Sequence, residues 1–495
     1  MTAPHDDARI YIVGAGFAGR AIAREIRENG IFGTVVAFLD DDPEKIGRRI
    51  DGTPVLGPVR DVASLIVRTP GDEAIVAIPS ASRETLRELY FTLKRAGFAR
   101  IRILPSVAQI VEGEAHLVQA REIDPQDLLG RTPVAIGLKE SLAWLRGRRV
   151  LITGAGGSIG SELARQLLSA GVERLYLFGH GENSIYQVDR ELRALQDGGV
   201  GESTAVVPVI GDLKDSTYIA HVMRRLRADV VFHAAAYKHV PMTEANTVAA
   251  IENNVFGTLN LVEACLGAGV GRFVLVSTDK AVEPLCVYGA SKYLCERIVL
   301  AAQADAGEDG QYMVVRFGNV LGSRGSILPL FMAQMARGGP VTVTHPEASR
   351  YFMTIPEACS LVLKTGGVGT GGESYLLDMG EPVLIRDLAE QVIRFSGYEP
   401  DKDIRIEYVG LRPGERLTEK LKSDDEDLEP TSFPMINRLV RRPDGFPLEE
   451  ALAALAPVCF PDARRPGEYR NRRVLRDALR TYLPTVEDKP DEPVY

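Results

Sequence analysis

The chain has 495 residues, of which 45% are hydrophobic and 25% are charged, the balance of a soluble globular protein. A chain of this length exceeds one ordinary core, so we expect two or three domains. The 58 basic and 67 acidic residues give a net charge of −9, which argues against a protein that coats nucleic acid or an anionic membrane. No stretch reaches the roughly 18 continuous apolar residues of a membrane span, and the first residues do not form a signal peptide.

The cysteines and histidines predict neither a disulfide framework nor a metal site. The five cysteines are odd in number and show no C-x-x-C spacing, which is typical of reduced thiols in a cytoplasm. The seven histidines form no H-x-x-H or H-E-x-x-H cluster. We therefore expect a cytoplasmic protein without a bound metal.

One pattern occurs twice along the chain, as RIYIVGAGFAGRAIAREI at residues 9–26 and RRVLITGAGGSIGSELARQLL at residues 148–168. Each copy has the form of a buried strand, a glycine turn and an amphipathic helix, and each is followed by a second strand, as a βαβ unit requires. We predict an α/β fold with two tandem Rossmann-type parallel-sheet domains and a smaller lobe after the second.

The predicted divisions follow the lapses in this periodicity. They are an N-terminal nucleotide-binding or regulatory domain at 1–130, a linker at 131–147, a catalytic domain at 148–422 and a C-terminal extension at 423–495. The acidic run 423–429 is expected to be a solvated loop, and the Pro- and acid-rich end from about residue 484 is expected to be frayed.

The first glycine turn carries Gly14, Gly16 and Gly19 in G-x-G-x-x-G spacing, with Asp40 at the end of the next predicted strand. Such a turn brings backbone N–H groups and a helix N-terminus close to a phosphate, while the carboxylate meets a ribose hydroxyl. A second nucleotide site is one interpretation. A domain that keeps the packing glycines without a working site is the other.

The second glycine turn spells T-G-x-x-G-x-x-G at Thr153, Gly154, Gly157 and Gly160, the spacing of short-chain dehydrogenases/reductases. Here the extra glycine space accommodates a dinucleotide pyrophosphate over the helix N-terminus. Asp212 stands where a carboxylate meets the adenine edge in that superfamily. The next predicted strand ends at Gly179 and His180 instead of at an acid, so NAD and NADP both remain admissible.

A third group of residues follows a later strand and carries the chemistry. Tyr288 and Lys292 are one helical turn apart and share a face, where the ammonium can lower the phenol's pKa and bind the nicotinamide ribose. Thr278 precedes an adjacent acid and amine, Asp279 and Lys280. This pair supplies a proton donor and a proton acceptor for a second step beyond hydride transfer; the alternative is a solvent-exposed ion pair at a loop.

The motifs LFGHGENSIY, HAAAYKHVPMTE, STDKAVEP, VRFGNVLGSRGSILPLF and GLRPGERL resemble the bacterial polysaccharide-biosynthesis UDP-N-acetylglucosamine 4,6-dehydratases, which are extended short-chain dehydrogenases/reductases. The resemblance is dense over residues 147–422 and extends to the first domain through VGAGFAGRAI and FLDDDPEKIG. Long members of the family commonly begin with membrane helices, which this sequence lacks, so no membrane attachment is expected. Many long members have methionine where Tyr288 stands, which leaves the stereochemistry at sugar carbon 5 open.

The resemblance implies a dehydration with an internal redox cycle. Tyr288, assisted by Lys292 and Thr278, would deprotonate the sugar 4-hydroxyl as hydride leaves carbon 4 for NAD(P)⁺. Lys280 would then remove the carbon 5 proton while Asp279 protonates the departing 6-hydroxyl. Hydride returns to carbon 6, so the cofactor stays tightly bound and is regenerated in each turnover, and the product is a UDP-2-acetamido-2,6-dideoxy-4-hexulose for surface polysaccharide or glycan biosynthesis.

The resemblance also implies contacts for the two ligands. The expected partner is UDP-N-acetylglucosamine or a close UDP-HexNAc, and the protein is expected to be a homo-oligomer that binds no nucleic acid. Asn254 is expected to orient an active-site water or lysine. The expected cofactor contacts are Thr153, Gly154, Gly157, Ser158, Ile159, Gly160, His180, Asp212, Leu213, Ala234, Ala235, Ala236, Asn254, Tyr288 and Lys292. The expected substrate contacts are Lys238, His239, Asn319, Arg324, Arg412 and Glu415.

Two other functions remain open. A UDP-sugar 4-epimerase or 4-reductase on the same scaffold needs Thr278, Tyr288 and Lys292 but has no use for Asp279 and Lys280. A nucleotide-sensing regulator would keep the glycine turns without turnover. The complete catalytic set argues against this second alternative.

Overall fold

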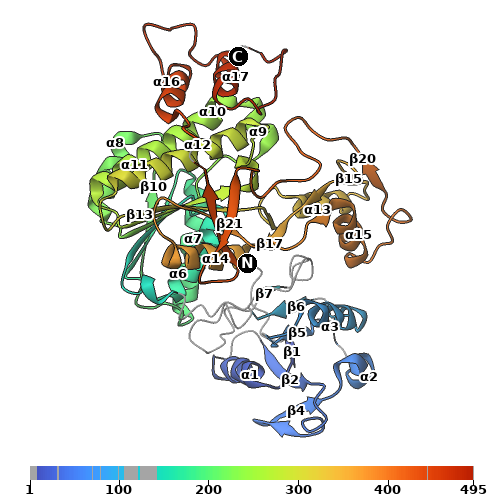
Figure 1. Cartoon of the computed structure of the whole chain (residues 1–495). Helices are drawn as coiled ribbons and strands as arrows, with labels where there is room; N and C mark the ends of the chain where they lie inside the picture. The colour runs from blue at the N-terminus through green and yellow to red at the C-terminus, as the bar shows by residue number, and fades with distance from the viewer. Residues whose placement is uncertain are drawn as a thin grey trace. The chain divides into compact units, whose positions relative to one another are not determined.

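The structure is a computed structural model that describes residues 8–29, 33–67, 69, 71–78, 80–98, 100–104, 121–122, 142–442 and 444–493. The chain divides into two compact units, Met1–Ser141 with Arg193–Glu202 and Leu142–Leu192 with Ser203–Tyr495 (Figure 1). Each unit is described by itself. Most of the predicted linker, residues 131–147, lies outside the described residues. No helix among the described residues is long and apolar enough to span a membrane.

The first unit is built on a mostly parallel sheet. Within its described residues the strand order is β3-β4-β2-β1-β5-β6-β7, with β3 and β7 antiparallel to their neighbours. The strands are β1 (Arg9–Val13), β2 (Thr34–Leu39), β3 (Arg49–Ile50), β4 (Thr53–Leu56), β5 (Glu73–Val76), β6 (Arg100–Ile103) and β7 (Arg121–Glu122). The helices are α1 (Phe17–Asn29), η1 (Val59–Asp61), α2 (Val62–Leu65) and α3 (Arg83–Arg95). Buried Ile10, Ile12 and Phe38 fix α1 to this sheet, so the first predicted Rossmann-type unit is confirmed.

The second unit contains a larger sheet that is parallel over most of its width. Among the described residues its order is β10-β9-β8-β11-β12-β13-β18-β22-β21, and only the β18–β22 and β22–β21 pairs are antiparallel. The strands are β8 (Arg149–Thr153), β9 (Arg174–Gly179), β10 (Ala205–Ile210), β11 (Val230–His233), β12 (Arg272–Thr278), β13 (Gln311–Phe317), β18 (Ser374–Leu377), β21 (Glu426–Pro430) and β22 (Ile436–Arg441). This sheet is the second predicted Rossmann-type unit, as expected for the α/β fold.

Helices cover both faces of the larger sheet. Helices α8, α11 and α12 pack together, and α6 packs with α14 (Figure 1). The helices before β13 are η4 (Ala143–Leu145), α6 (Ser158–Ser169), α7 (Glu182–Asp197), α8 (Ser216–Leu226), α9 (Val240–Ala245), α10 (Thr247–Ile251), the π-helical turn η5 (Glu252–Phe256), α11 (Gly257–Ala268), η6 (Asp279–Ala281), α12 (Val287–Ala301) and η7 (Ala302–Asp305). Those after it include α14 (Ile355–Val368), α16 (Leu448–Cys459) and α17 (Arg472–Tyr482).

A smaller lobe follows β13, as the sequence predicts. It contains short strand pairs and two helices, so its elements are too small to extend the main sheet. Its strands pair as β14 (Asn319–Leu321) with β17 (Phe352–Thr354), β15 (Val341–Val343) with β20 (Ile406–Tyr408), and β16 (Ser349–Arg350) with β19 (Val383–Leu384). The helices are α13 (Ile327–Met335) and α15 (Ile385–Phe395).

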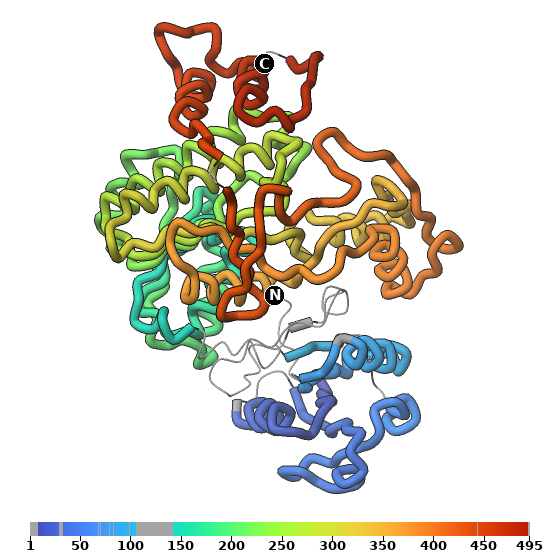
Figure 2. The backbone as a smooth tube through the Cα atoms, viewed as in Figure 1, coloured from blue at the N-terminus to red at the C-terminus, as the bar shows by residue number. Residues whose placement is uncertain are grey.

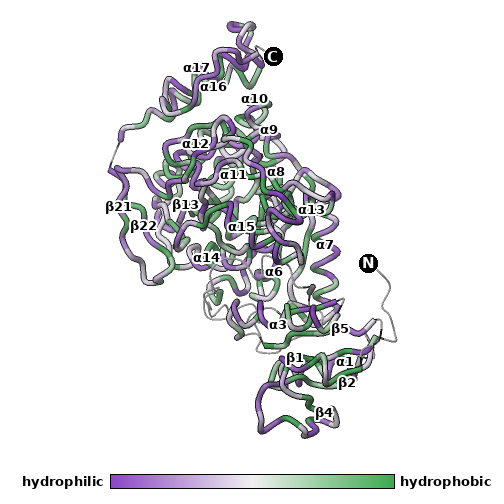
Figure 3. Tube along the Cα trace, turned by 90° about the vertical axis from the view of Figure 1, so that its right-hand side faces the viewer, coloured by the Kyte–Doolittle hydropathy of each residue, from purple (hydrophilic) through white to green (hydrophobic). Residues whose placement is uncertain are grey.

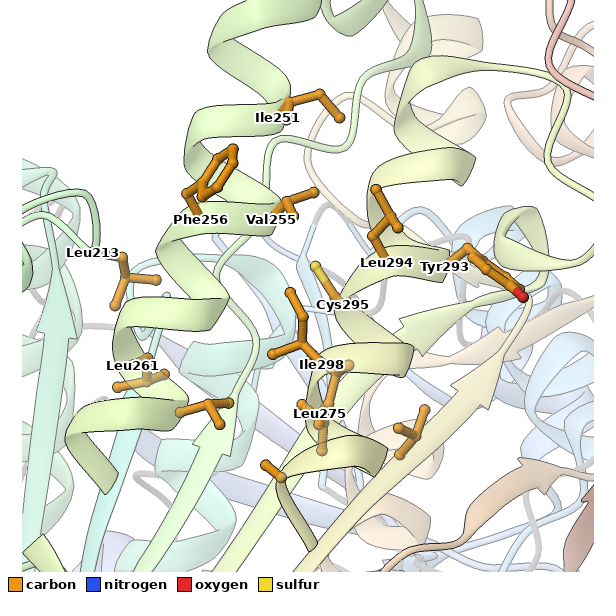
Figure 4. Packing of buried hydrophobic residues seen from close by; sticks show 14 of the residues in the cluster. Leu213, Ile251, Val255, Phe256, Leu261, Leu275, Tyr293, Leu294, Cys295 and Ile298 are labelled. Atoms are coloured by element: carbon orange, nitrogen blue, oxygen red, sulfur yellow. The ribbon is translucent and has the colours of Figure 1, made fainter. Parts of the chain in front are cut away.

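The main core of the second unit lies between α11 and α12 and the sheet. Figure 4 shows side chains of η5 and α11 facing those of α12, with Val255 of η5 on one side and Leu294 and Ile298 of α12 on the other. Each of these side chains is at most 3% exposed. Tight packing here fixes the rotation of α12 about its axis, and with it the direction in which the other face of α12 points.

The C-terminal region differs from both sequence expectations. The acidic run was expected to be a solvated loop, but β21 begins at Glu426 and pairs with β22, and Glu426 is only 2% exposed. The end of the chain was expected to be frayed, but Val486 and Glu492 are buried. Helices α16 and α17 both contact α10. In Figure 2 this part of the chain is the red tube beside the green helices, and Figure 3 shows hydrophilic and hydrophobic residues alternating along α16 and α17. The buried acidic residues are ion-paired, Glu426 with Arg316 and Arg441 and Glu492 with Arg472 and Arg476, which composition alone does not reveal.

A buried ion triad ties α12 and β13 to β21. Arg316 Nη2 lies 2.7 Å from Glu296 Oε2, and its Nη1 lies 2.8 Å from Glu426 Oε2. Arg316 is 1% exposed, and burial, which would lower its pKa, is outweighed by the two carboxylates, which raise it. Glu296 also accepts a hydrogen bond from Ser277 at 2.5 Å, so the triad fixes the strand end that carries the predicted catalytic residues.

The Arg316→Met variant is expected to lose about 3–5 kcal/mol of unfolding free energy in the second unit, because Glu296 is left buried without its cation and Glu426 keeps only Arg441. Urea unfolding followed by the fluorescence of Trp144, the one tryptophan of the chain, measures this loss. The control Arg386→Met removes an exposed arginine that pairs with Asp387 and Glu390, and should change the value by less than about 1 kcal/mol. Equal losses in the two variants would contradict the assignment.

Candidate active site

The second glycine turn follows β8 and leads directly into α6. Gly154 has a φ of +68°, and a Cβ there would lie 2.7 Å from the backbone of Ala235. A Cβ on Gly160 would lie 2.2 Å from the carbonyl oxygen of Gly154, so the turn and the helix approach too closely for side chains. Helix α6 begins at Ser158 without a side-chain cap. Close backbone approach and an uncapped helix N-terminus together suit the pyrophosphate of a dinucleotide.

The other residues expected around a cofactor lie at the same edge of the sheet. Strands β8 to β11 run parallel, so their carboxyl ends share that edge. The residues there are Thr153 at the end of β8, Ser158 and Ile159 in the first turn of α6, His180 after β9, Asp212 and Leu213 after β10, and Ala234, Ala235 and Ala236 after β11. His180 is exposed and lies edge-on to Tyr237, with 6.4 Å between ring centroids. The fold therefore brings this predicted set together.

A buried histidine that the sequence analysis did not single out joins β8 to α11. His233 Nδ1 lies 2.6 Å from Thr153 Oγ1, and its Nε2 lies 2.9 Å from Thr258 Oγ1. Burial, aided by the charge of Lys292, lowers the pKa of His233 to about 3, so the ring is neutral at physiological pH. Its only sequence signal was a histidine in an otherwise apolar strand end, FHAAA.

The side chain of Asn254 holds the loop after β11. Its Oδ1 accepts a hydrogen bond from Tyr237 N at 2.8 Å, and its Nδ2 donates to Tyr237 O at 3.0 Å and to Ser291 Oγ at 2.9 Å. Asn254 lies in the π-helical turn η5, and such turns are frequent at functional sites. These hydrogen bonds join the loop to α12. The expected role in orienting a water or a lysine stays a prediction.

Asp279 lies at the end of β12 and is almost fully buried, at 1% exposure. Its Oδ1 accepts hydrogen bonds from Thr278 Oγ1 at 2.9 Å and from Lys280 Nζ at 3.1 Å. Its Oδ2 is buried and has no hydrogen-bond partner among the described residues. An orphaned buried carboxylate oxygen is costly, and it marks the place where a polar ligand atom would be bound. The alternative of a solvent-exposed ion pair does not fit this burial.

The Lys280 ammonium has acceptors on three sides. Besides Asp279, its Nζ lies 3.3 Å from Glu419 Oε1 and 3.4 Å from Asn319 Oδ1. Burial would lower the pKa of Lys280, but the charges of Asp279 and Glu419 outweigh it and raise the pKa. Lys280 is therefore held as an ammonium. Asn319, expected to contact substrate, is thereby placed at the acid–base pair.

Tyr288 and Lys292 lie on the buried side of α12. Tyr288 is 8% exposed and Lys292 is 3% exposed. Burial raises the pKa of Tyr288 to about 12, against the lowering effects of the Lys280 charge and a hydrogen bond with Thr278. The sequence analysis expected Lys292 to lower this pKa, whereas here Lys280 is the cation that does so. Burial lowers the pKa of Lys292 itself.

Lys238 and His239 lie on the loop after β11, next to the loop after β14. Lys238 Nζ donates to Ser323 Oγ at 3.3 Å, and a Cβ on Gly325 would lie 2.3 Å from the ring of His239. Burial lowers the pKa of Lys238, and the charge of Lys280 lowers it further. Lys238 is thus close enough to Lys280 to feel its charge. The fold brings these two expected substrate residues to the same mouth as the acid–base pair.

Arg324 contacts the second glycine turn, and its expected binding of the substrate stays a prediction. Its Nη1 donates to Gly156 O at 2.8 Å, and its backbone N donates to Ser158 Oγ at 3.0 Å. The guanidinium therefore binds the second glycine turn. The sequence did not reveal this, because the contact joins segments far apart in the chain.

Arg412 and Glu415 form a turn in which two hydrogen bonds join these two residues. Glu415 N donates to Arg412 O at 3.0 Å, and Glu415 Oε2 accepts from Arg412 N at 3.3 Å. The Arg412 side chain is exposed. Binding of a diphosphate and a ribose by these two residues stays a prediction.

Two charged residues at the site were missed by the sequence analysis. Glu419 is 6% exposed and lies between Lys280 and Arg350, whose Nε is 3.7 Å from Glu419 Oε1. Arg350 Nη1 donates to Ser349 O at 2.7 Å and to Leu417 O at 3.0 Å. Glu419 and Arg350 each lie close to a motif that was recognised in the sequence. They come together at Lys280 only because the smaller lobe contacts the end of β12.

The first glycine turn has the backbone of a dinucleotide turn, but its acid is engaged. Gly14 has a φ of +101°, and a Cβ on Gly19 would lie 1.9 Å from Gly14 O, whereas Gly16 has open space around it. Asp40 Oδ2 accepts from Ala15 N at 2.6 Å and lies 3.3 Å from Lys45 Nζ. A second nucleotide site there stays a prediction.

In the described part of the chain, no three His, Cys, Asp or Glu residues are grouped to hold a metal ion.

Comparison with known proteins bears on this arrangement. Residues 150–441 match the model of a family described as polysaccharide biosynthesis protein. The capsular polysaccharide biosynthesis protein CapD of Staphylococcus aureus is 42% identical over 417 residues, which cover 84% of this chain and 68% of CapD. These matches confirm the family resemblance found in the sequence.

Two further proteins are similar over part of the chain. The UDP-N-acetylglucosamine 4,6-dehydratase (inverting) of Campylobacter jejuni is 32% identical over 282 residues, which cover 57% of this chain and 79% of that enzyme. The X-ray structure of Pen from Bacillus thuringiensis has a TM-score of 0.54 and 31% identity, covering 60% of this chain and 88% of Pen.

The Glu419→Gln variant tests how Lys280 is held. Without the negative charge of Glu419 the Lys280 ammonium is less stable, so we expect the pKa of Lys280 to fall by about 1 or more. Acylation of Lys280 by acetic anhydride across a pH series, followed by peptide mass spectrometry, measures this, because only the neutral amine reacts. Glu283→Gln removes a carboxylate that pairs with Lys420 instead, and serves as the control. An unchanged pH profile in Glu419→Gln would refute the assignment.

Proposed function

The chain belongs to the family of polysaccharide biosynthesis proteins, and on that premise we propose that it is a UDP-N-acetylglucosamine 4,6-dehydratase. The observation that carries the proposal is the buried acid–amine pair, Asp279 and Lys280, beside Thr278 and Tyr288. A dehydration needs an acid and a base in addition to the residues for hydride transfer. The product would be a UDP-2-acetamido-2,6-dideoxy-4-hexulose, and the similarity to the Campylobacter enzyme supports this choice of substrate.

The carboxyl edge of the larger sheet fits NAD or NADP. The second glycine turn leaves no room for a Cβ at Gly154 or Gly160, and α6 begins without a side-chain cap, so backbone N–H groups would hold the pyrophosphate. When bound, the cofactor takes a hydride from sugar carbon 4 and returns it to carbon 6. We assign Lys292 to the nicotinamide ribose, and Arg324 to the cofactor side because it binds the glycine turn. Strand β9 is followed by His180 and not by an acid, which would repel the 2′-phosphate of NADP. Either NAD or NADP therefore fits.

The chain's own residues supply the proton transfers. Tyr288 first releases its own proton to solvent, because burial raises its pKa to about 12 and it rests as a phenol. The phenolate, assisted by Thr278 and Lys292, then takes the proton of the 4-hydroxyl. At rest the proton of the acid–amine pair is on Lys280, so it must first cross the 3.1 Å hydrogen bond to Asp279 Oδ1. The neutral Lys280 amine then takes the carbon 5 proton, which the 4-ketone has made acidic, and Asp279 gives its proton to the leaving 6-hydroxyl. As hydride returns to carbon 6, the Lys280 ammonium gives its proton back to carbon 5. A proton from solvent then restores the ammonium and matches the one that Tyr288 released, so the proton count closes.

Substrate binding would draw on loops around this pair. Asn319 and Lys238 lie beside Lys280, and His239 lies next to them. Arg412 and Glu415 offer a guanidinium for the diphosphate and a carboxylate for the uridine ribose. We propose that the residues beside Lys280 bind the sugar end of the UDP-sugar, and that Arg412 and Glu415 bind its UDP end.

Incubation with UDP-N-acetylglucosamine and analysis of the product by mass spectrometry tests the reaction. We expect the product mass to fall by one water. A product of unchanged mass with a new retention time would contradict dehydration and indicate 4-epimerisation. Unconverted substrate after prolonged incubation with added NAD and NADP would contradict both reactions.

The Asp279→Asn, Lys280→Ala double variant tests the acid–base pair. We expect dehydration to fall by about 10²- to 10⁴-fold, because the variant lacks both proton-transfer groups, while NAD(P) stays bound. The matched control is Asp424→Asn with Lys420→Ala, an exposed acid–amine pair 4.0 Å apart. The control should turn over like the unmodified protein. Ordinary turnover by the double variant at positions 279 and 280 would remove the proposed roles.

A further inference from the structure

Residues 484–492 lie against the loop that precedes α12. Thr485 Oγ1 donates to Pro284 O at 2.9 Å, and Glu487 N donates to Leu285 O at 2.9 Å. Between them, Val486 is 1% exposed and packs in the core of the catalytic unit. We call residues 484–492 the C-terminal strap. The strap therefore binds the backbone just before the helix that carries Tyr288.

The same strap also holds the turn of Arg412 and Glu415. Glu487 Oε2 accepts a hydrogen bond from Gly414 N at 2.8 Å. Gly414 has a φ of +80°, and a Cβ there would lie 2.7 Å from Cys286 Cβ, so the turn lies directly on the loop before α12. One residue, Glu487, thus joins two loops that come from distant parts of the sequence.

The segment between Lys280 and Tyr288 is held from a second direction. Arg416, next to the turn, donates from its Nη2 to Glu283 O and to Val282 O. The turn and the C-terminal strap therefore both bind the segment between Lys280 and Tyr288. One end of this segment carries the acid–base pair, and the other end carries the tyrosine. Through this segment the turn is held at a defined place relative to the acid–base pair and the tyrosine.

A buried ion cluster fixes the base of the strap. Glu244 Oε1 accepts a hydrogen bond from Val287 N, the first residue of α12, at 2.8 Å, and its Oε2 lies 2.9 Å from Arg476 Nη2. Lys489 and Glu492, both in the strap, bind Glu244 and Arg476 respectively. Burial raises the pKa of Glu244, but Lys489, Val287 and Arg476 outweigh it and lower the pKa. Buried charges of this kind favour one arrangement over alternatives, because each needs its partner.

We propose that the C-terminal strap is a positioning element of the active site, and that Glu487 sets the turn of Arg412 and Glu415 for substrate binding. The turn carries Arg412 and Glu415, which we assign to the sugar nucleotide, so the strap is expected to act on substrate binding and not on the binding of NAD(P). The inference rests on the proposed function for its kinetic consequence. Its structural consequence, that Glu487 protects the Gly414 amide, is independent of that function.

The Glu487→Ala variant tests the strap. We expect the KM for UDP-N-acetylglucosamine to rise by about tenfold, because a hydrogen bond to a charged group is lost, with kcat changed by less than about twofold. Hydrogen exchange measured by mass spectrometry should show faster exchange in the peptide spanning residues 410–416. Glu487→Gln keeps an acceptor oxygen and should restore both values.

The matched control is Asp488→Ala. Asp488 is the neighbouring strap residue, but it pairs at the surface with Arg473 and Arg480 and bonds neither loop. It should leave KM and exchange unchanged. Should Glu487→Ala not fold, Thr485→Val removes only the bond to Pro284 O at constant volume, and should speed exchange over residues 281–289.

The outcomes separate the two proposals. Faster exchange of the turn in Glu487→Ala, without any turnover in the unmodified protein, would support the strap and refute the dehydratase. Turnover with the same KM and the same exchange in Glu487→Ala and Asp488→Ala would refute the strap and leave the dehydratase standing. If only Thr485→Val can be measured, unchanged exchange over 281–289 refutes the strap.

Discussion

The hydrogen bond between the Asp279 carboxylate and the Lys280 ammonium is the constraint on which the rest of the site depends. An unpaired charge is expensive in a buried place, so each charge at the end of β12 requires a partner of opposite sign. Lys280 forms an ion pair with Asp279, Glu419 forms one with Lys280, and Arg350 forms one with Glu419. This alternation explains why the smaller lobe and the end of β12 must meet. Their meeting places an acid and an amine in one cleft mouth.

Helix α12 is fixed by polar contacts at its start and by packing along its length. Glu244 caps its first residue, the triad of Glu296, Arg316 and Glu426 anchors its middle, and apolar side chains pack it against α11. A helix held in this way presents its catalytic residues in one orientation. The arrangement assigns the buried acidic residues of the catalytic unit to structure, and leaves the orphaned oxygen of Asp279 for chemistry.

Much of the site could be predicted from the sequence because its signals are local. The glycine spacing of the second turn, the helical spacing of Tyr288 and Lys292, and the adjacency of Asp279 and Lys280 each lie within a few residues. Glu419 and Arg350 could not be recognised, because a single charged residue has no spacing to reveal it. Arg324 was assigned to the substrate for the same reason, since its partner Gly156 is a backbone carbonyl that no pattern marks.

By itself, the sequence determined two Rossmann-type sheets, the glycine turns and the order of the catalytic groups, because hydrophobic periodicity and close backbone approach are encoded over short stretches. Only the tertiary structure decided which charges are buried together. It turned an acidic run into β21, packed the end of the chain against α12, and left the proton of the acid–base pair on Lys280. The physical reason is that the free energy of a charge depends on its burial and partners, and both are set by residues distant in the chain.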